Sequence, residues 1–318
     1  MLPHLTFFVE LTEGPLRELL RREEVLEALQ RRGAAVSLAM LDLSPTRARV
    51  IRRLNRRQIP VTAWLLLDHL DGYWLTADNA PLAHQRYLEV MDWCAREGLV
   101  LSAVGLDIET PHNDSLALVR HGRTALRRLV RFRRSRDALL TAARQYAELI
   151  DEIHHDGLQV ETYQFPLVVD ERRAGSTFLQ RVLGFVEVAP DREVLMLYRS
   201  LLPGPVGEAL VDAYGTDADA IAVGITGGGV PFLLEAVGAR RLDLDQVLTD
   251  LRRARRYTDR LYVFSLEGCV ESGYLQALCD AAPDRPVTPA ALAPLLRLAR
   301  DFLRLLLWAE RVWDRVLG

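Results

Sequence analysis

The strongest constraint on the fold is a repeated alternation of two kinds of segment. Short apolar runs rich in β-branched residues are each followed by a longer, arginine-rich stretch with helical periodicity. Because a helix after each strand returns the chain to the same edge of a sheet, this order predicts parallel strands connected by helices. We expect eight strands, at residues 5–11, 35–41, 61–67, 102–108, 159–164, 193–198, 220–225 and 261–266.

Eight such units in 318 residues predict one α/β domain, a (β/α)8 TIM barrel that spans residues 1–318. An open doubly wound sheet is the alternative, but no GxGxxG pattern of dinucleotide-binding sheets follows the first strand. A long connection, residues 110–156, follows strand four. The apolar segment 289–317 is expected to be the last helix, which closes the barrel against the first.

The basic residues restrict the chemistry, because all 40 are arginine. A lysine-free chain has no Schiff-base lysine, no pyridoxal-phosphate lysine and no Walker lysine. The formal net charge of −3 gives no general attraction to nucleic acid or to an anionic membrane. Eight arginines lie within residues 120–136, where a solvated helix face is expected and a phosphate site is the alternative.

The cysteine pattern and the chain ends bear on localisation. Cys94, Cys269 and Cys279 are odd in number and widely spaced, without a CxxC or zinc pattern, which favours a reducing compartment. The N-terminus lacks the pattern of a signal peptide, and charged residues interrupt every apolar run before it reaches membrane-spanning length. We therefore expect a cytoplasmic protein with no membrane or nucleic-acid partner, no cofactor and no bound metal; the sequence leaves its oligomeric state open.

The fourth predicted strand ends in two acids, Asp107 and Glu109, which alternation along a strand sends to the same side. In a barrel, the carboxyl ends of all strands meet at one mouth, where active sites are built. Carboxylates transfer protons to glycosidic oxygens, and aromatic faces stack on sugar rings, so acids and aromatic residues together predict a carbohydrate cleft. The other candidates at predicted strand ends are Glu10, Asp68, Tyr73, Trp74, Tyr163, Gln164, Tyr198 and Glu267.

The Asp-x-Glu spacing suits substrate-assisted glycoside cleavage. Glu109 would protonate the leaving oxygen, because the negative charge of Asp107 holds the pKa of Glu109 above its usual range. Asp107 would orient a substrate acetamido group that acts as the internal nucleophile, and Tyr198 would hydrogen-bond the same group. Glu267, Glu10 and Asp68 are secondary candidates for a nucleophile or for sugar contacts.

Two short segments resemble a known family. Gly105-Leu-Asp-Ile-Glu109 resembles the end of the strand-four signature Asp-x-x-Asp-x-Asp-x-Glu of chitinases and endo-N-acetylglucosaminidases, and Met196-Leu-Tyr198 resembles their Met-x-Tyr. The resemblance implies a (β/α)8 barrel and the roles just given. The chain departs from the family pattern at four positions: Ser102 and Gly105 replace the earlier aspartates, Arg199 replaces an aspartate, and Glu267 replaces a tryptophan.

Three other functions stay open. A divalent-metal-dependent sugar isomerase or epimerase would hold its ion with oxygen ligands from Glu10, Asp107, Glu109 and Glu267. A phosphosugar enzyme would use the glycines at 227–229. A barrel that binds glycans without cleaving them is the third.

Overall fold

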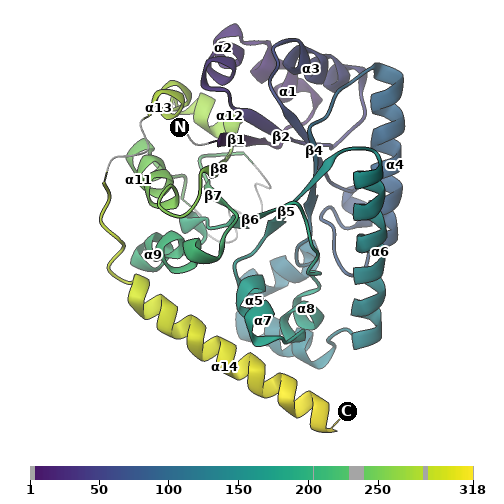
Figure 1. The fold of residues 1–318 in the computed structure, drawn as a ribbon, viewed down its shortest axis with the longest axis vertical. Helices are drawn as coiled ribbons and strands as arrows, with labels where there is room; N and C mark the ends of the chain where they lie inside the picture. Colours follow the sequence, from purple (N-terminus) through teal and green to yellow (C-terminus); the bar gives the residue numbers. More distant parts are fainter. Residues whose placement is uncertain (1–3, 203, 229–239, 282–285, 318) are drawn as a thin grey trace.

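The computed structural model describes residues 4–202, 204–228, 240–281 and 286–317. It confirms the predicted fold. Eight parallel strands form a closed barrel in sequence order, in which β1 pairs with β2 on one side and with β8 on the other. Helices surround the strands (Figure 1). The strands are β1 His4–Val9, β2 Ala35–Ala39, β3 Val61–Leu65, β4 Ala103–Asp107, β5 Gln159–Gln164, β6 Arg192–Met196, β7 Ala220–Gly224 and β8 Arg260–Phe264.

The described helices follow the strands as the sequence pattern predicts, with additional short helices after β5 and β8. Gly33, Gly98 and Gly175 end three of them in the left-handed conformation that glycine adopts without strain. The helices are α1 Glu13–Arg21, α2 Glu23–Arg32, α3 Pro45–Arg56, α4 Ala80–Glu97, α5 His112–Arg131, α6 Arg136–His155, α7 Leu167–Ala174, α8 Phe178–Leu183, α9 Gly204–Tyr214, α11 Leu244–Ala254, α12 Leu266–Glu271, α13 Leu275–Asp280 and α14 Ala293–Leu317.

The segment between β1 and β2 forms two helices, α1 and α2, rather than one. Arg22 takes an extended conformation between α1 and α2, with φ −71° and ψ 118°. The guanidinium of Arg53 in α3 donates hydrogen bonds to the carbonyls of Leu20 and Arg21, each at 3.1 Å. This contact from a distant segment satisfies backbone groups that the break exposes, so the local sequence pattern does not reveal it.

Two apolar layers build the core. The outward-facing strand residues pack against the helices in one large cluster, which includes Val36, Leu106 and Val263. The inward-facing residues fill the barrel itself and are strongly aromatic. The ring of Phe8 lies 5.4 Å from Trp64 and 4.8 Å from Tyr163, both edge to face. Such pairs fill the barrel interior below the mouth with rigid side chains.

The connection at residues 110–156 holds α5 and α6, which lie outside the barrel (Figure 1). Within its basic segment, Arg134 binds the carboxylate of Asp78, and Arg136 binds that of Asp314 at 2.8 Å. These two arginines are thus engaged in ion pairs with acids from other segments.

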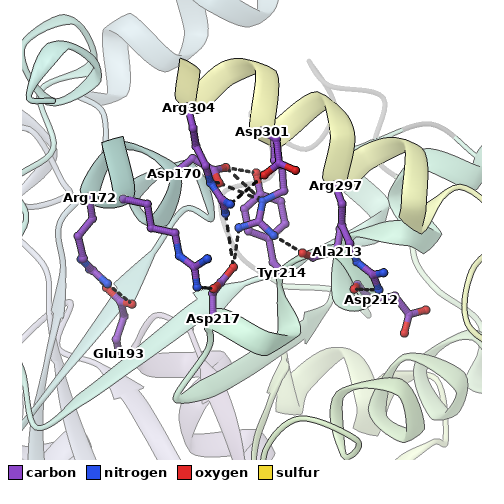
Figure 2. Close-up of polar contacts among 12 residues, drawn as sticks. Asp170, Arg172, Glu193, Asp212, Ala213, Tyr214, Asp217, Arg297, Asp301 and Arg304 are labelled. Atoms are coloured by element: carbon purple, nitrogen blue, oxygen red, sulfur yellow. Dashed lines mark hydrogen bonds and ion pairs between the residues drawn. The ribbon is translucent and has the colours of Figure 1, made fainter. Parts of the chain in front are cut away.

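The C-terminal helix corrects one expectation. It was expected to close the barrel against the first helix, but α14 packs mainly on α9 and α7, with smaller contact to α8 (Figure 1). On the side of β1 and α2, the barrel is covered by α12 and α13. The reason is electrostatic, because arginines of α14 bind acids and carbonyls at α7 and α9 (Figure 2). Among the described helices, none has the length and apolar character needed to cross a membrane.

Candidate active site

A cavity of about 100 Å³ opens at the carboxyl ends of the strands. Its walls are mostly apolar and aromatic, and three carboxyl groups reach it, which is the composition expected of a small-molecule site. Among the described residues, no arginine lines it, although the chain has 40 basic residues. The lining residues are Phe8, Glu10, Trp64, Trp74, Asp107, Glu109, Tyr163, Phe165, Met196, Tyr198, Leu201, Ile225 and Phe264.

Asp107 and Glu109 both reach this cavity, as the strand alternation predicts. Asp107 is the last residue of β4 and is 2% exposed; Glu109 follows it and is 7% exposed. The indole N–H of Trp64 donates a hydrogen bond to Oδ2 of Asp107 at 3.1 Å. The two acids therefore lie in an apolar environment, where charge is poorly solvated.

The segment after β3 is hydrogen-bonded to the segment after β4. Leu75 and Ile108 form a parallel bridge: the N–H of Leu75 donates to the carbonyl of Asp107 at 3.0 Å, and the N–H of Glu109 donates to the carbonyl of Leu75 at 2.8 Å. Two hydrogen bonds thus fix the backbone on both sides of Ile108. The orientation of Glu109 toward the cavity follows from this extension of the sheet beyond the strand.

Burial is the largest cause of a raised pKa in both acids. For Glu109, the negative charge of Asp107 and a hydrogen bond to it raise the pKa further, well above its usual range. For Asp107, the hydrogen bonds from Glu109 and Trp64 act in the opposite direction and lower the pKa. Burial and the charge of Asp107 thus both favour the protonated form of Glu109, whereas the hydrogen bonds to Asp107 favour its ionised form.

Glu10 is a third buried carboxyl at the mouth, directly after β1. The hydroxyl of Tyr73 donates a hydrogen bond to Oε1 of Glu10. Burial raises the pKa of Glu10 to about 8; the hydrogen bond from Tyr73 opposes this rise, and the charges of Glu267 and Asp107 add to it. Glu10 therefore also carries a proton at neutral pH.

Glu267 lies beside Glu10, because closure of the barrel makes β8 the neighbour of β1. Its Oε1 accepts a hydrogen bond from the N–H of Glu10 at 3.3 Å, and burial raises its pKa to about 7. Glu267 is not among the described residues that line the cavity. The structure thus groups it with Glu10 rather than with the Asp107 and Glu109 pair.

The floor of the cavity is formed partly by Tyr163, whose hydroxyl lies 2.6 Å from that of Ser37. Tyr163 pairs in register with Asp107. A Cβ at Gly105 would lie 2.4 Å from the Tyr163 hydroxyl oxygen, so the phenol fills the space where the chitinase-like signature has an aspartate. The glycine is therefore required by the tyrosine beside it.

Tyr198 and Trp74 also line the cavity. Tyr198 follows β6 and is buried; burial raises the pKa of its phenol, and the charges of Asp107, Glu109 and Glu10 raise it further. The ring of Trp74 packs edge to face on Tyr73, with centroids 5.8 Å apart. Both side chains thus lie at the same cavity as the acids.

Two predicted residues are placed elsewhere. Gln164 is buried beside Tyr163, but the alternation of β5 turns it away from the barrel interior. Asp68 is exposed and lines a separate surface hollow together with Asp42, Asp71 and Glu89. Neither is among the described residues at the cavity. Tyr73 does not line it either, but contacts two residues that do, Glu10 and Trp74.

Sequence reasoning missed the apolar half of the site. Trp64 and Phe264 line the cavity but lie within strands, where the sequence pattern of a large apolar residue indicates a buried core position. The alternation of side chains along a strand could have revealed Trp64. Trp64 pairs in register with Gly105, two residues before Asp107, so the side chains of Trp64 and Asp107 face the same side of the sheet. Within the described part of the chain, no group of three or more His, Cys, Asp or Glu side chains is arranged to hold a metal ion.

Known proteins are similar to the chain in structure alone. No protein family matches the chain, and no curated protein does. A GH18 chitinase from Pseudoalteromonas aurantia is similar in structure, with a TM-score of 0.49 and 9% identity over 86% of this chain and 98% of that one. The PgaB glycoside hydrolase domain from Bordetella bronchiseptica has a TM-score of 0.48 and 10% identity over 88% of this chain and 98% of that one. The 3-keto-D-glucoside 4-epimerase YcjR from E. coli has a TM-score of 0.45 and 11% identity over 87% of this chain and 97% of that one.

Proposed function

We infer that the protein is a glycoside hydrolase that uses Glu109 as general acid and Asp107 as its helper. The observation that carries this proposal is a buried carboxyl, Glu109, beside a second carboxyl, Asp107, in an apolar, aromatic cavity at the barrel mouth. A general acid must hold its proton at working pH, and burial next to Asp107 supplies that condition.

In the proposed reaction, Glu109 donates its proton to the glycosidic oxygen as that bond breaks, and the carbonyl oxygen of the substrate acetamido group bonds to the anomeric carbon in its place. A water molecule, which gives its proton back to Glu109, then attacks the anomeric carbon, displaces the acetamido oxygen and releases the sugar. Asp107, held by Trp64, is the acceptor that orients a polar substituent of the sugar, with an acetamido group as the expected case. Tyr198 lies at the same cavity and would contact that substituent. Trp74 and Phe264 supply apolar surface for the C–H face of the ring.

A screen of chromogenic glycosides, including N-acetylglucosaminides, with and without EDTA, tests this function. We expect turnover that EDTA leaves unchanged and that Glu109→Gln reduces by at least about 10²-fold, the usual contribution of a general acid. Glu18→Gln, an exposed change on α1, is the matched control and should retain activity.

Other outcomes separate the alternatives. No release of chromophore, together with an EDTA-sensitive interconversion of free sugars, would favour a metal-dependent isomerase or epimerase. Sugar binding by calorimetry, without turnover and unchanged in Glu109→Gln, would identify a glycan-binding barrel. Full turnover by Glu109→Gln would overturn the assignment of the acid.

A further inference from the structure

Helix α14 exposes a long apolar face. Its large apolar side chains include Leu298, Phe302 and Trp313, which are 65%, 62% and 69% exposed. The helix has 25 residues, about 37 Å at 1.5 Å per residue, and runs along the edge of the barrel (Figure 1). Contiguous apolar surface of this kind marks an interaction site in a folded protein.

The exposed residues follow a heptad repeat. One row is Leu295, Phe302, Ala309 and Val316, spaced by seven residues. The second row lies three residues after the first and consists of Leu298, Leu305 and Val312. Alternating steps of three and four are the pattern of a coiled-coil seam, in which one helix packs along another. We call these seven residues the α14 seam.

The opposite face of α14 holds the helix on its own barrel. The guanidinium of Arg300 binds Asp170 at 3.0 Å and Asp217 at 2.6 Å, and lies 3.6 Å from the centre of the Tyr214 ring. Arg304 adds a second hydrogen bond to Asp170 at 2.8 Å (Figure 2). These ion pairs orient the helix, so the seam faces outward because the polar face is bound inward.

This charge arrangement argues against a membrane as the occupant. A helix that lies on a membrane carries free Lys or Arg side chains beside its apolar face, where they meet anionic headgroups. In α14, Arg300 and Arg304 are bound to acids of the barrel. The side chain of Asp301, between them in sequence, is 66% exposed and would repel anionic lipid.

The area matches one side of a stable protein interface. Leu306, Trp308 and Trp313 flank the seam and are each more than half exposed. At about 200 Å² for a large apolar side chain, the exposed parts of the seam and these neighbours amount to roughly 1,000 Å². A standard interface buries about 800 Å² on each partner.

We propose that α14 is a dimerisation helix, whose seam packs against the same seam of a second copy of this chain across a two-fold axis. A two-fold interface uses one patch on both subunits, and a heptad seam is complementary to itself. Each subunit keeps its own barrel, and the arginine contacts to α7 and α9 remain within each subunit.

Light scattering coupled to gel filtration tests the proposal. The chain has a mass of 35.9 kDa, and we expect the intact protein to elute at twice that mass. The double variant Leu298→Glu/Leu305→Glu places four carboxylates in the dimer seam and should elute as a monomer with an unchanged circular dichroism spectrum. Leu140→Glu, on the exposed face of α6, is the matched control and should stay dimeric.

A cysteine crosslink tests the dimer without charged substitutions in the α14 seam, which could themselves destabilise the protein. Leu305 is near the middle of α14, so its two copies approach each other whether the helices run parallel or antiparallel. The native cysteines are buried, so Leu305→Cys supplies the accessible thiol and should give a disulfide dimer on oxidation, whereas Leu140→Cys should not. A monomeric intact protein at its highest soluble concentration would overturn the proposal, as would a monomer that floats with phosphatidylglycerol vesicles.

Discussion

The indole N–H of Trp64 on β3 donates to Oδ2 of Asp107 at the end of β4, across 3.1 Å. This hydrogen bond favours the ionised form of Asp107, whereas burial favours the neutral form. The charge of Asp107 in turn raises the pKa of Glu109. One donor on a neighbouring strand therefore affects the protonation of both acids.

Trp64→Phe removes this donor and keeps most of the ring. Hydrogen bonds to charged groups contribute about 1.5–3 kcal/mol, so the pKa of Asp107 should rise by about one to two units. The titration of the Asp107 carboxyl, followed by ¹³C NMR, measures the change, and the acid limb of any pH–rate profile should move in the same direction. Trp93→Phe, a buried change on α4, should leave that pKa where it is. Equal titration in wild type and Trp64→Phe would refute the role of Trp64.

Gly105→Ala should destabilise the protein, because its Cβ would lie 2.4 Å from the Tyr163 hydroxyl oxygen and 2.8 Å from ring atoms. Overpacking of this kind costs about 1–3 kcal/mol. Gly14→Ala is the control: nothing lies within 4 Å of its added Cβ, and in helix α1 alanine should stabilise by about 0.5–1 kcal/mol. Urea unfolding compares the two variants, and a neutral Gly105→Ala would show that Tyr163 moves freely.

Glu10→Gln should alter how stability depends on pH. The pKa of Glu10 rises from 4.5 to about 8 on burial, so between these pH values the folded chain holds a proton that the unfolded chain releases. Stability attributable to this group is complete below about pH 4.5 and is lost as the pH rises through about 8. The variant should therefore melt at a higher temperature than wild type at about pH 9, and the difference should shrink toward pH 4.5. Melting curves across this range measure it, with Glu18→Gln as an exposed control; a pH-independent difference would contradict the burial effect.

Arg300→Met should loosen α14 from the barrel. The substitution leaves the buried carboxylates of Asp170 and Asp217 with less positive charge beside them. Removing one partner of a buried ion pair lowers the free energy of unfolding by about 3–5 kcal/mol. Arg17→Met breaks an exposed pair with Glu18 and should cost at most about 1 kcal/mol. Hydrogen exchange at α14 separates local loosening from global unfolding, and equal effects of the two variants would show that the buried pairs do not anchor the helix.

The strands and the acids at their ends could be predicted from the sequence, for a local reason. Strand alternation is a property of neighbouring residues, and closure of the barrel brings all strand ends to one mouth. These two facts are enough to predict which acids and which tyrosine meet at the cavity: Asp107, Glu109, Glu10 and Tyr198.

The partners of those acids could not be predicted, because they depend on contacts between distant segments. Tyr73 reaches Glu10 from a left-handed backbone conformation, with φ 64°, in the connection after β3. Nothing in the sequence around Tyr73 indicates that conformation. Likewise, the place of α14 follows from Asp170 and Asp217, which lie more than 80 residues before their arginines.

The bridge between Leu75 and Ile108 has a consequence for how this site can change. The loop that carries Tyr73 and Trp74 continues into Leu75, whose backbone makes the hydrogen bonds on either side of Ile108. Lengthening or shortening that loop would shift both a wall of the cavity and the side chain of Glu109. Among the described residues, Tyr198 and Leu201 after β6 also line the cavity, so changes there should alter its shape without moving the backbone beside Ile108.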